Sequence, residues 1–295
     1  TAPAGVLRSN NESVTSATAI TDASGIATFN NLGFEASVTT AQTLTFTADA
    51  FVGATAQITP SFVATAIAIT NSGTTGGQFV DGVFQATSAS STNIRASDLV
   101  TALSTQNIVI ESAGNLTVST PVTSTSGNDL TLNCAGSGVF TNTSGAITLA
   151  GDLTVSCASV TTSAALTTTS SGEVSLTSLV GGISVGSGVT SATSIELIPK
   201  TTYGGAGALN AGTSISTTGG SSITLGGNLT AGTSINLQGS STFSNTTAVL
   251  TSGADTTISG VGVQLGTGAM TVDGDLTISS TGNFSSGTTG IYGSP

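Results

Sequence analysis

Two cysteines are the residues whose type and spacing could support covalent chemistry. Cys134 and Cys157 each close a segment of the form Asp-Leu-Thr-aliphatic-polar-Cys, and they lie 23 residues apart. If one coil of a repeating β fold separates them, the two side chains stack about 4.8 Å apart, within reach of a disulfide. The alternative is a ladder of two buried thiols. A disulfide would require an oxidising compartment.

Asp273 and Asp275 flank a glycine and form a close pair of carboxylates. Strand alternation puts both side chains on one side of the chain, so a weak calcium site is one interpretation. The Gly-Gly-X-Gly-X-Asp repeat that binds calcium in other solenoids is absent from the sequence, and a solvated corner is the simpler interpretation. We expect no resident metal and no cofactor.

The other ionisable residues argue against catalysis. The chain has no histidine, which excludes histidine-based triads, His-ligated zinc and histidine general bases. The carboxylates are scattered singly, and Arg95 and Lys200 have no acidic companion at a multiple of one coil. We therefore predict that the protein is not an enzyme. A carbohydrate-active β-helix enzyme, which would need clustered carboxylates in a groove, is kept as an alternative.

Charge and apolar patterning exclude two classes of partner. Three Lys and Arg residues against fourteen Asp and Glu residues give a formal net charge of −11, so the phosphates of nucleic acid would be repelled. No apolar run approaches the roughly 18–20 residues of a membrane span. The apolar fraction of 37% still allows a buried core.

Short β-strands must position these residues. Apolar side chains recur two residues apart, in short segments separated by Gly, Ser, Asn and Asp. Similar stretches begin at Ala146, Ser222 and Ala269, and their spacing divides into a repeat of 23–25 residues. The sequence therefore predicts an all-β fold, a right-handed parallel β-helix whose coils stack to form a continuous Val/Ile/Leu core. An antiparallel sandwich would explain the alternation but not the recurrence.

The segment 97–104 has helical spacing, and Ser97 or Asp98 can cap it. A short helix here would cover the open end of the stack. The stretch Ala96-Ser-Asp-Leu-Val-Thr-Ala-Leu-Ser-Thr-Gln-Asn-Ile-Val-Ile110, followed by Gly114-Asn-Leu-Thr-Val118, resembles filamentous-haemagglutinin-type and autotransporter-type β-helices of bacterial surface proteins. The resemblance extends over about 80–295.

Residues 1–65 resemble the second half of a bacterial immunoglobulin-like domain. The resemblance lies in Ala23-Ser-Gly-Ile-Ala-Thr-Phe-Asn-Asn-Leu-Gly-Phe34 and in the later Leu44-Thr-Phe46. The usual sandwich needs roughly 100 residues, so either the chain is a fragment or a neighbouring molecule adds the missing strands. We assign 1–65 to this incomplete Ig-like β-sandwich, 66–80 to a linker and 81–295 to the β-helix.

These features predict a non-enzymatic, extracellular structural or adhesive protein of a bacterial surface that forms an elongated stalk or filament. The expected partners are neighbouring copies, joined end to end by strand complementation in a fibre, and a glycan or surface receptor. Nucleic-acid binding and membrane insertion are not expected. Thr-X-Thr pairs such as Thr123/Thr125 resemble those of ice-binding solenoids, but in the sequence they do not recur at one coil register.

Overall fold

The computed structural model describes residues 63–87, 90–287 and 290, together with the backbone of 291–293 and of five N-terminal strands. In the N-terminal region, β1 (Gly5–Ser9) pairs antiparallel with β2 (Glu12–Val14) and β3 (Leu32–Ala36), and β4 (Gln42–Ala48) pairs antiparallel with β5 (Phe51–Ile58). Of the immunoglobulin-like module expected over 1–65, only the backbone of these five strands and residues 63–65 are described.

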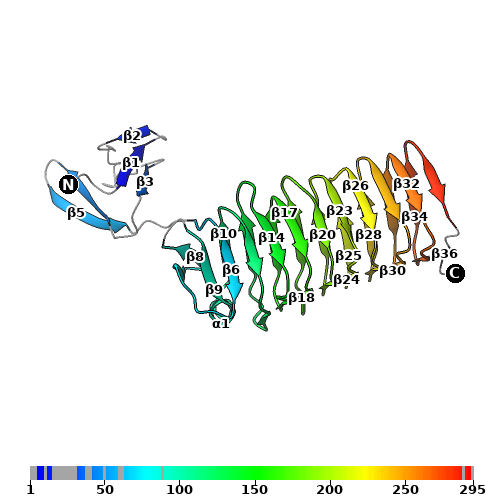
Figure 1. Cartoon of the computed structure of the whole chain (residues 1–295), viewed down its shortest axis with the longest axis horizontal. Coiled ribbons are helices and arrows are strands. Elements are labelled where there is room, and N and C mark those ends of the chain that lie inside the picture. The colour runs from blue at the N-terminus through cyan, green and yellow to red at the C-terminus, as the bar shows by residue number, and fades with distance from the viewer. Residues whose placement is uncertain are drawn as a thin grey trace.

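The rest of the chain is a parallel β-solenoid over residues 67–286 (Figure 1). From β10 onward the chain visits three sheets in a fixed order, so three successive strands make one turn. We number the turns from turn 1, which is β10–β12, to turn 9, which is β34–β36. With the N-terminal elements β6–β9 and α1, the stack has about ten turns. The predicted parallel β-solenoid is thus confirmed.

Sheet one is the sheet that begins each turn. It contains β7 (Gly77–Val80), β8 (Val83–Ala86), β10 (Ile108–Ser112), β13 (Leu130–Cys134), β16 (Leu153–Cys157), β19 (Val174–Ser178), β22 (Ile195–Ile198), β25 (Ser214–Thr217), β28 (Ser234–Gln238), β31 (Thr256–Gly260) and β34 (Leu276–Ser280).

Sheet two follows sheet one in each turn. It contains β6 (Ile67–Thr70), β9 (Thr92–Arg95), β11 (Leu116–Val118), β14 (Val139–Asn142), β17 (Ser159–Thr162), β20 (Ile183–Val185), β23 (Thr202–Gly205), β26 (Ser222–Leu225), β29 (Thr242–Asn245), β32 (Gly262–Leu265) and β35 (Phe284–Ser286).

Sheet three completes each turn with strands of three residues. It contains β12 (Val122–Ser124), β15 (Ile147–Leu149), β18 (Leu166–Thr168), β21 (Val189–Ser191), β24 (Leu209–Ala211), β27 (Leu229–Ala231), β30 (Leu250–Ser252), β33 (Met270–Val272) and β36 (Ile291–Gly293).

The turn is shorter than the expected 23–25 residues over most of the stack. From Ile195, which pairs with Ile215, each residue of sheet one pairs with a residue 20 or 21 positions further on. From β10 onward, spacings of 23 or more occur only in the first four turns, as where Val122 pairs with Ile147 and Leu166 pairs with Val189. The predicted period was wrong because the stretch at Ser222 begins a strand of sheet two, whereas those at Ala146 and Ala269 lead into sheet three.

Alternation places every second side chain inside. In β13, Leu130 and Leu132 have no exposed surface, and Thr131 between them faces outward. In sheet three, Leu250 pairs with Leu229 on one side and Met270 on the other, and all three are fully or almost fully buried. Burying one such side chain contributes about 1.5–3 kcal/mol, so stacked turns share one continuous aliphatic core.

The N-terminal end of the stack is closed by α1 (Ala96–Leu103), which packs against β12 in the place of a further strand of sheet three. Its own residues Leu99 and Leu103 are fully buried. The Leu103 carbonyl accepts hydrogen bonds from Ser126 Oγ at 2.6 Å and Asn128 Nδ2 at 2.7 Å. The helix is therefore anchored to the first turn.

Two details differ from the sequence predictions. The N-cap residue of α1 is Arg95, without a side-chain cap, and the Asp98 carboxylate instead accepts a hydrogen bond from Thr74 Oγ1 at 2.6 Å. The expected linker over 66–80 carries β6, which pairs with β11, and β7, which pairs with β8. The solenoid therefore begins earlier than predicted.

Candidate functional site

Cys134 and Cys157 form a disulfide between β13 and β16, the sheet-one strands of turns 2 and 3. Their Cα atoms lie 4.5 Å apart, and the two residues are 3% and 0% exposed. Buried Ser112 precedes them and buried Ser178 follows them at the same register position. The two cysteines are therefore stacked on adjacent turns, and their sulfur atoms are bonded to each other.

Asp273 and Asp275 lie exposed at the corner between β33 and β34. The Asp273 backbone N–H donates to the Ser252 carbonyl at 3.1 Å, and the Asp275 N–H donates to Asp255 Oδ1 at 2.9 Å. Among the residues that the structure describes, no group of three or more His, Cys, Asp or Glu side chains could hold a metal ion. The backbone N–H groups of both residues are thus bonded to the preceding turn.

The corner bond of Asp255 repeats elsewhere in the stack. Asp129 Oδ1 accepts the N–H of Asp152 at 2.9 Å, and Asp152 Oδ1 accepts the N–H of Glu173 at 2.8 Å. Each carboxylate binds the equivalent residue of the next turn, where the corner interrupts the strand ladder. Sequence reasoning did not assign this role. The signal was present, since three of these residues open the repeated Asp-Leu-Thr segments.

Sheet three carries one outward file of hydroxyls. Each strand from β12 to β33 has buried first and last residues, so only the central side chain faces out. In register order the eight central residues from β12 to β33 are Thr123, Thr148, Thr167, Thr190, Asn210, Thr230, Thr251 and Thr271. Single threonines therefore recur at one register, whereas the expectation concerned Thr-X-Thr pairs. A three-residue strand offers one outward position, so the file is single.

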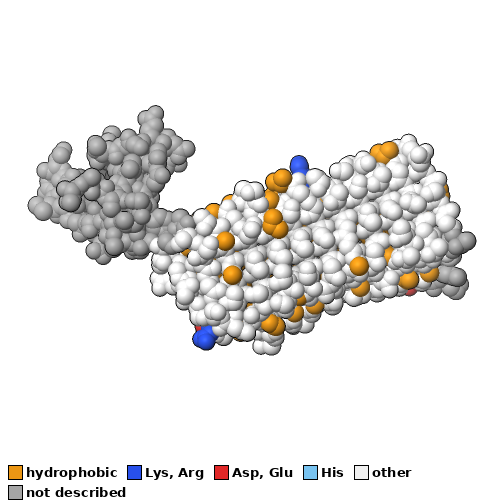
Figure 2. Space-filling model, in the orientation of Figure 1, with side chains coloured by type: hydrophobic (Ala, Val, Ile, Leu, Met, Phe, Trp, Pro, Cys, Tyr) orange, Lys and Arg blue, Asp and Glu red, His pale blue; other side chains and the backbone are white. Residues whose placement is uncertain are grey.

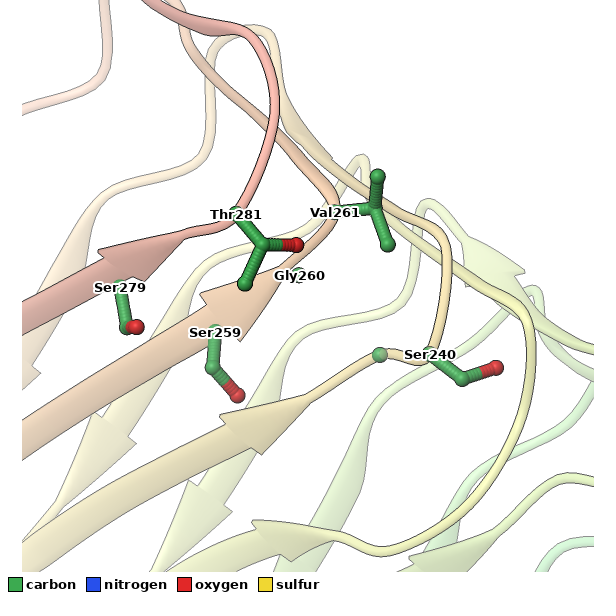
Figure 3. A pocket seen from close by; sticks show the side chains of 7 residues that line it. Ser240, Ser259, Gly260, Val261, Ser279 and Thr281 are labelled. Carbon is green, nitrogen blue, oxygen red and sulfur yellow. The ribbon is translucent and has the colours of Figure 1, made fainter.

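An open hollow of about 220 Å³ lies at the corner between sheets one and two in turns 7 to 9 (Figure 3). Ser259 and Ser279 lie side by side on paired strands, and Ser240, Val261 and Thr281 complete its rim (Figure 3). The Val261 side chain is 50% exposed. No ionisable side chain lines the hollow, so it offers hydroxyl hydrogen bonds and a small apolar contact but no acid or base.

The visible face of the solenoid is mostly uncharged polar surface with scattered hydrophobic side chains (Figure 2). Tyr203 is a buried ionisable group, 2% exposed, and burial raises the pKa of its hydroxyl, which therefore stays protonated. Among the described residues, no helix is long and apolar enough to cross a membrane. The visible face therefore offers mainly uncharged hydrogen-bonding groups.

Comparisons of the chain with protein-family models, with curated proteins and with solved structures find no match.

Proposed function

We propose that the protein is a non-enzymatic structural or adhesive component of a bacterial surface, in which the solenoid acts as an elongated stalk. One observation carries the proposal. From β10 to β34, every strand of sheet one pairs in parallel with its equivalent in the next turn, without a break. At about 4.8 Å per turn, nine turns span roughly 40 Å as one stiff rod.

The surface chemistry supports an adhesive rather than a catalytic use. The threonine file and the serine-lined hollow present hydroxyls that match the hydrogen-bonding groups of a glycan. Several carboxylates bind groups of the fold itself, as Asp129 Oδ1 does in accepting the N–H of Asp152. These features support a glycan or surface receptor as the partner.

The handedness of the solenoid, the location of the protein and its family resemblance are parts of the same proposal. A right-handed winding follows the preference of parallel β crossovers. The buried disulfide suits an extracellular, oxidising location. The filamentous-haemagglutinin-type resemblance and the Ig-like module over 1–65 rest on the sequence motifs. The end-to-end fibre stays a prediction, and the carbohydrate-active enzyme stays the alternative function.

Two experiments test the proposal. Immunogold labelling of source cells with antibody against the purified chain should mark intact cells, and labelling only after permeabilisation would contradict a surface location. Monomeric protein on arrays of glycans and matrix proteins should bind saturably. Absence of binding would contradict the adhesive role, and release of sugar from polysaccharides would contradict the non-enzymatic role.

A further inference from the structure

The disulfide lies at an irregular corner of the stack. In turn 2, four residues (135–138) connect β13 to β14. In turn 3, a single residue, Ala158, connects β16 to β17. The two corners are nevertheless stacked, since the Ala158 N–H donates to the Gly138 carbonyl at 2.8 Å. Turn 2 therefore holds three more residues at this corner than the turn that packs on it.

The register between turns 2 and 3 changes by those three residues. Before the corner, Leu130 pairs with Leu153, which is 23 positions away. After the corner, Val139 pairs with Ser159, which is 20 positions away. From β10 onward no other pair of consecutive strands in the described solenoid shows so large a change.

The extra residues leave the ladder as a small bulge. Residues 135–137 are exposed, and the Gly138 N–H donates to the Ala135 carbonyl at 3.1 Å, closing a tight turn. Gly136 has φ +61°, which glycine adopts without the strain of a side chain. The bulge itself therefore makes no strand pairing between the two turns.

The serines at the same register position fasten their own corners by hydrogen bonds. Ser112 Oγ donates to the Asn115 carbonyl at 3.2 Å, and Ser178 Oγ donates to the Gly181 carbonyl at 2.9 Å. Cys134 and Cys157 stand between these serines in the column and are bonded to each other instead. The covalent bond thus replaces the local hydrogen bond where the register shifts.

We propose that the Cys134–Cys157 disulfide is a register pin, a covalent link that holds turns 2 and 3 in register across a corner at which the two turns differ in length by three residues. The proposal does not depend on the proposed function. It assigns the bond a local task, whereas a disulfide that acts only through the entropy of the unfolded chain would stabilise all turns alike.

Hydrogen exchange of the full chain tests the pin. In the Cys134→Ser, Cys157→Ser variant, amides of 130–142 and 153–162 should exchange about tenfold faster or more, because these strands open locally. Amides beyond Ile195 should exchange as in the oxidised parent. Serine suits both sites, since Ser112 and Ser178 occupy the same buried column. Unchanged exchange near the corner, or equal acceleration along the whole solenoid, would overturn the proposal.

A second background sharpens the test. Deleting residues 135–137 gives turn 2 the one-residue corner of turn 3 and the same separation of 20 residues between turns 2 and 3 in sheets one and two. In this background, replacing both cysteines by serine should leave local exchange within about twofold of the disulfide form. If removing the disulfide accelerates exchange as much here as in the parent background, the bond does not compensate for the difference in corner length. If the deletion variant does not fold, the exchange pattern of the first variant decides alone.

Discussion

Single inward side chains decide how well each turn fits its neighbours. Thr256 lies between Ile235 and Leu276 in sheet one, is fully buried, and its Oγ1 has no hydrogen-bond partner. Thr256→Val keeps the side-chain shape and removes the unpaired oxygen, so urea denaturation should show a free energy of unfolding about 1 kcal/mol higher. The outward neighbour Thr257 is the control. Thr257→Val should change stability by less than about 0.5 kcal/mol, and a destabilised Thr256→Val would contradict this account.

Asn245 shows the opposite case, a buried polar side chain that is fully used. Its Oδ1 accepts the Ala248 N–H at 2.9 Å and its Nδ2 donates to the Ala248 carbonyl at 3.0 Å. Asn245→Ala leaves two buried backbone groups unpaired and should lower the free energy of unfolding by about 2–4 kcal/mol. The exposed Asn210 gives the comparison, because Asn210→Ala should be nearly neutral in the same titration. Equal losses at both sites would contradict the assigned bonds.

The positions of some single residues could be predicted from the sequence. Cys134 and Cys157 could be placed on neighbouring turns because their flanking segments are nearly identical. Asn245 and Thr256 could not be recognised as inward. In a chain so rich in Ser and Thr, a polar residue inside has the same local sequence as one outside, and only the pairing fixes which face it occupies.

At the scale of elements, α1 is the test of how the stack is closed. Leu99 is fully buried between the helix and the first turn. Leu99→Ala should cost about 2–5 kcal/mol, measured by urea denaturation, and should raise hydrogen exchange first in β9 and β12. Thr101→Ala on the exposed side of the helix should have little effect. A loss below about 1 kcal/mol at Leu99 would mean that the helix is not a cap.

Sequence patterns located elements better than they located registers. The helix and the alternating strands follow from local spacing, which the residues themselves carry. The period did not, because an aliphatic-Thr-aliphatic strand occurs in all three sheets, as at Leu130, Ile223 and Leu229. A local match therefore identifies a strand but not its side of the solenoid.

At the scale of the whole molecule, a stack with uniform turns should tolerate loss of one turn. Deleting residues 215–234 joins Ser214 to Ile235, which occupies the position of Ile215 one turn later. The variant should keep its β circular dichroism and cooperative unfolding, and small-angle scattering should show a rod about 5 Å shorter. Deleting only 215–224 puts strands on the wrong sheets and should abolish folding. Similar behaviour of the two deletions would contradict uniform turns.

The central claim is that equivalent residues lie directly above one another, one per turn. Pairs of spin labels in the outward file of sheet three test this arrangement. The distance between the labels is measured by double electron–electron resonance in the disulfide-bonded protein. One label is placed at Thr271 and the second at Thr167, Thr148 or Thr123, which lie five, six and seven turns away. The mean distance should increase by about 4.8 Å per added turn, from roughly 24 to 34 Å. Distances that do not rise in equal steps with the number of turns would contradict the solenoid.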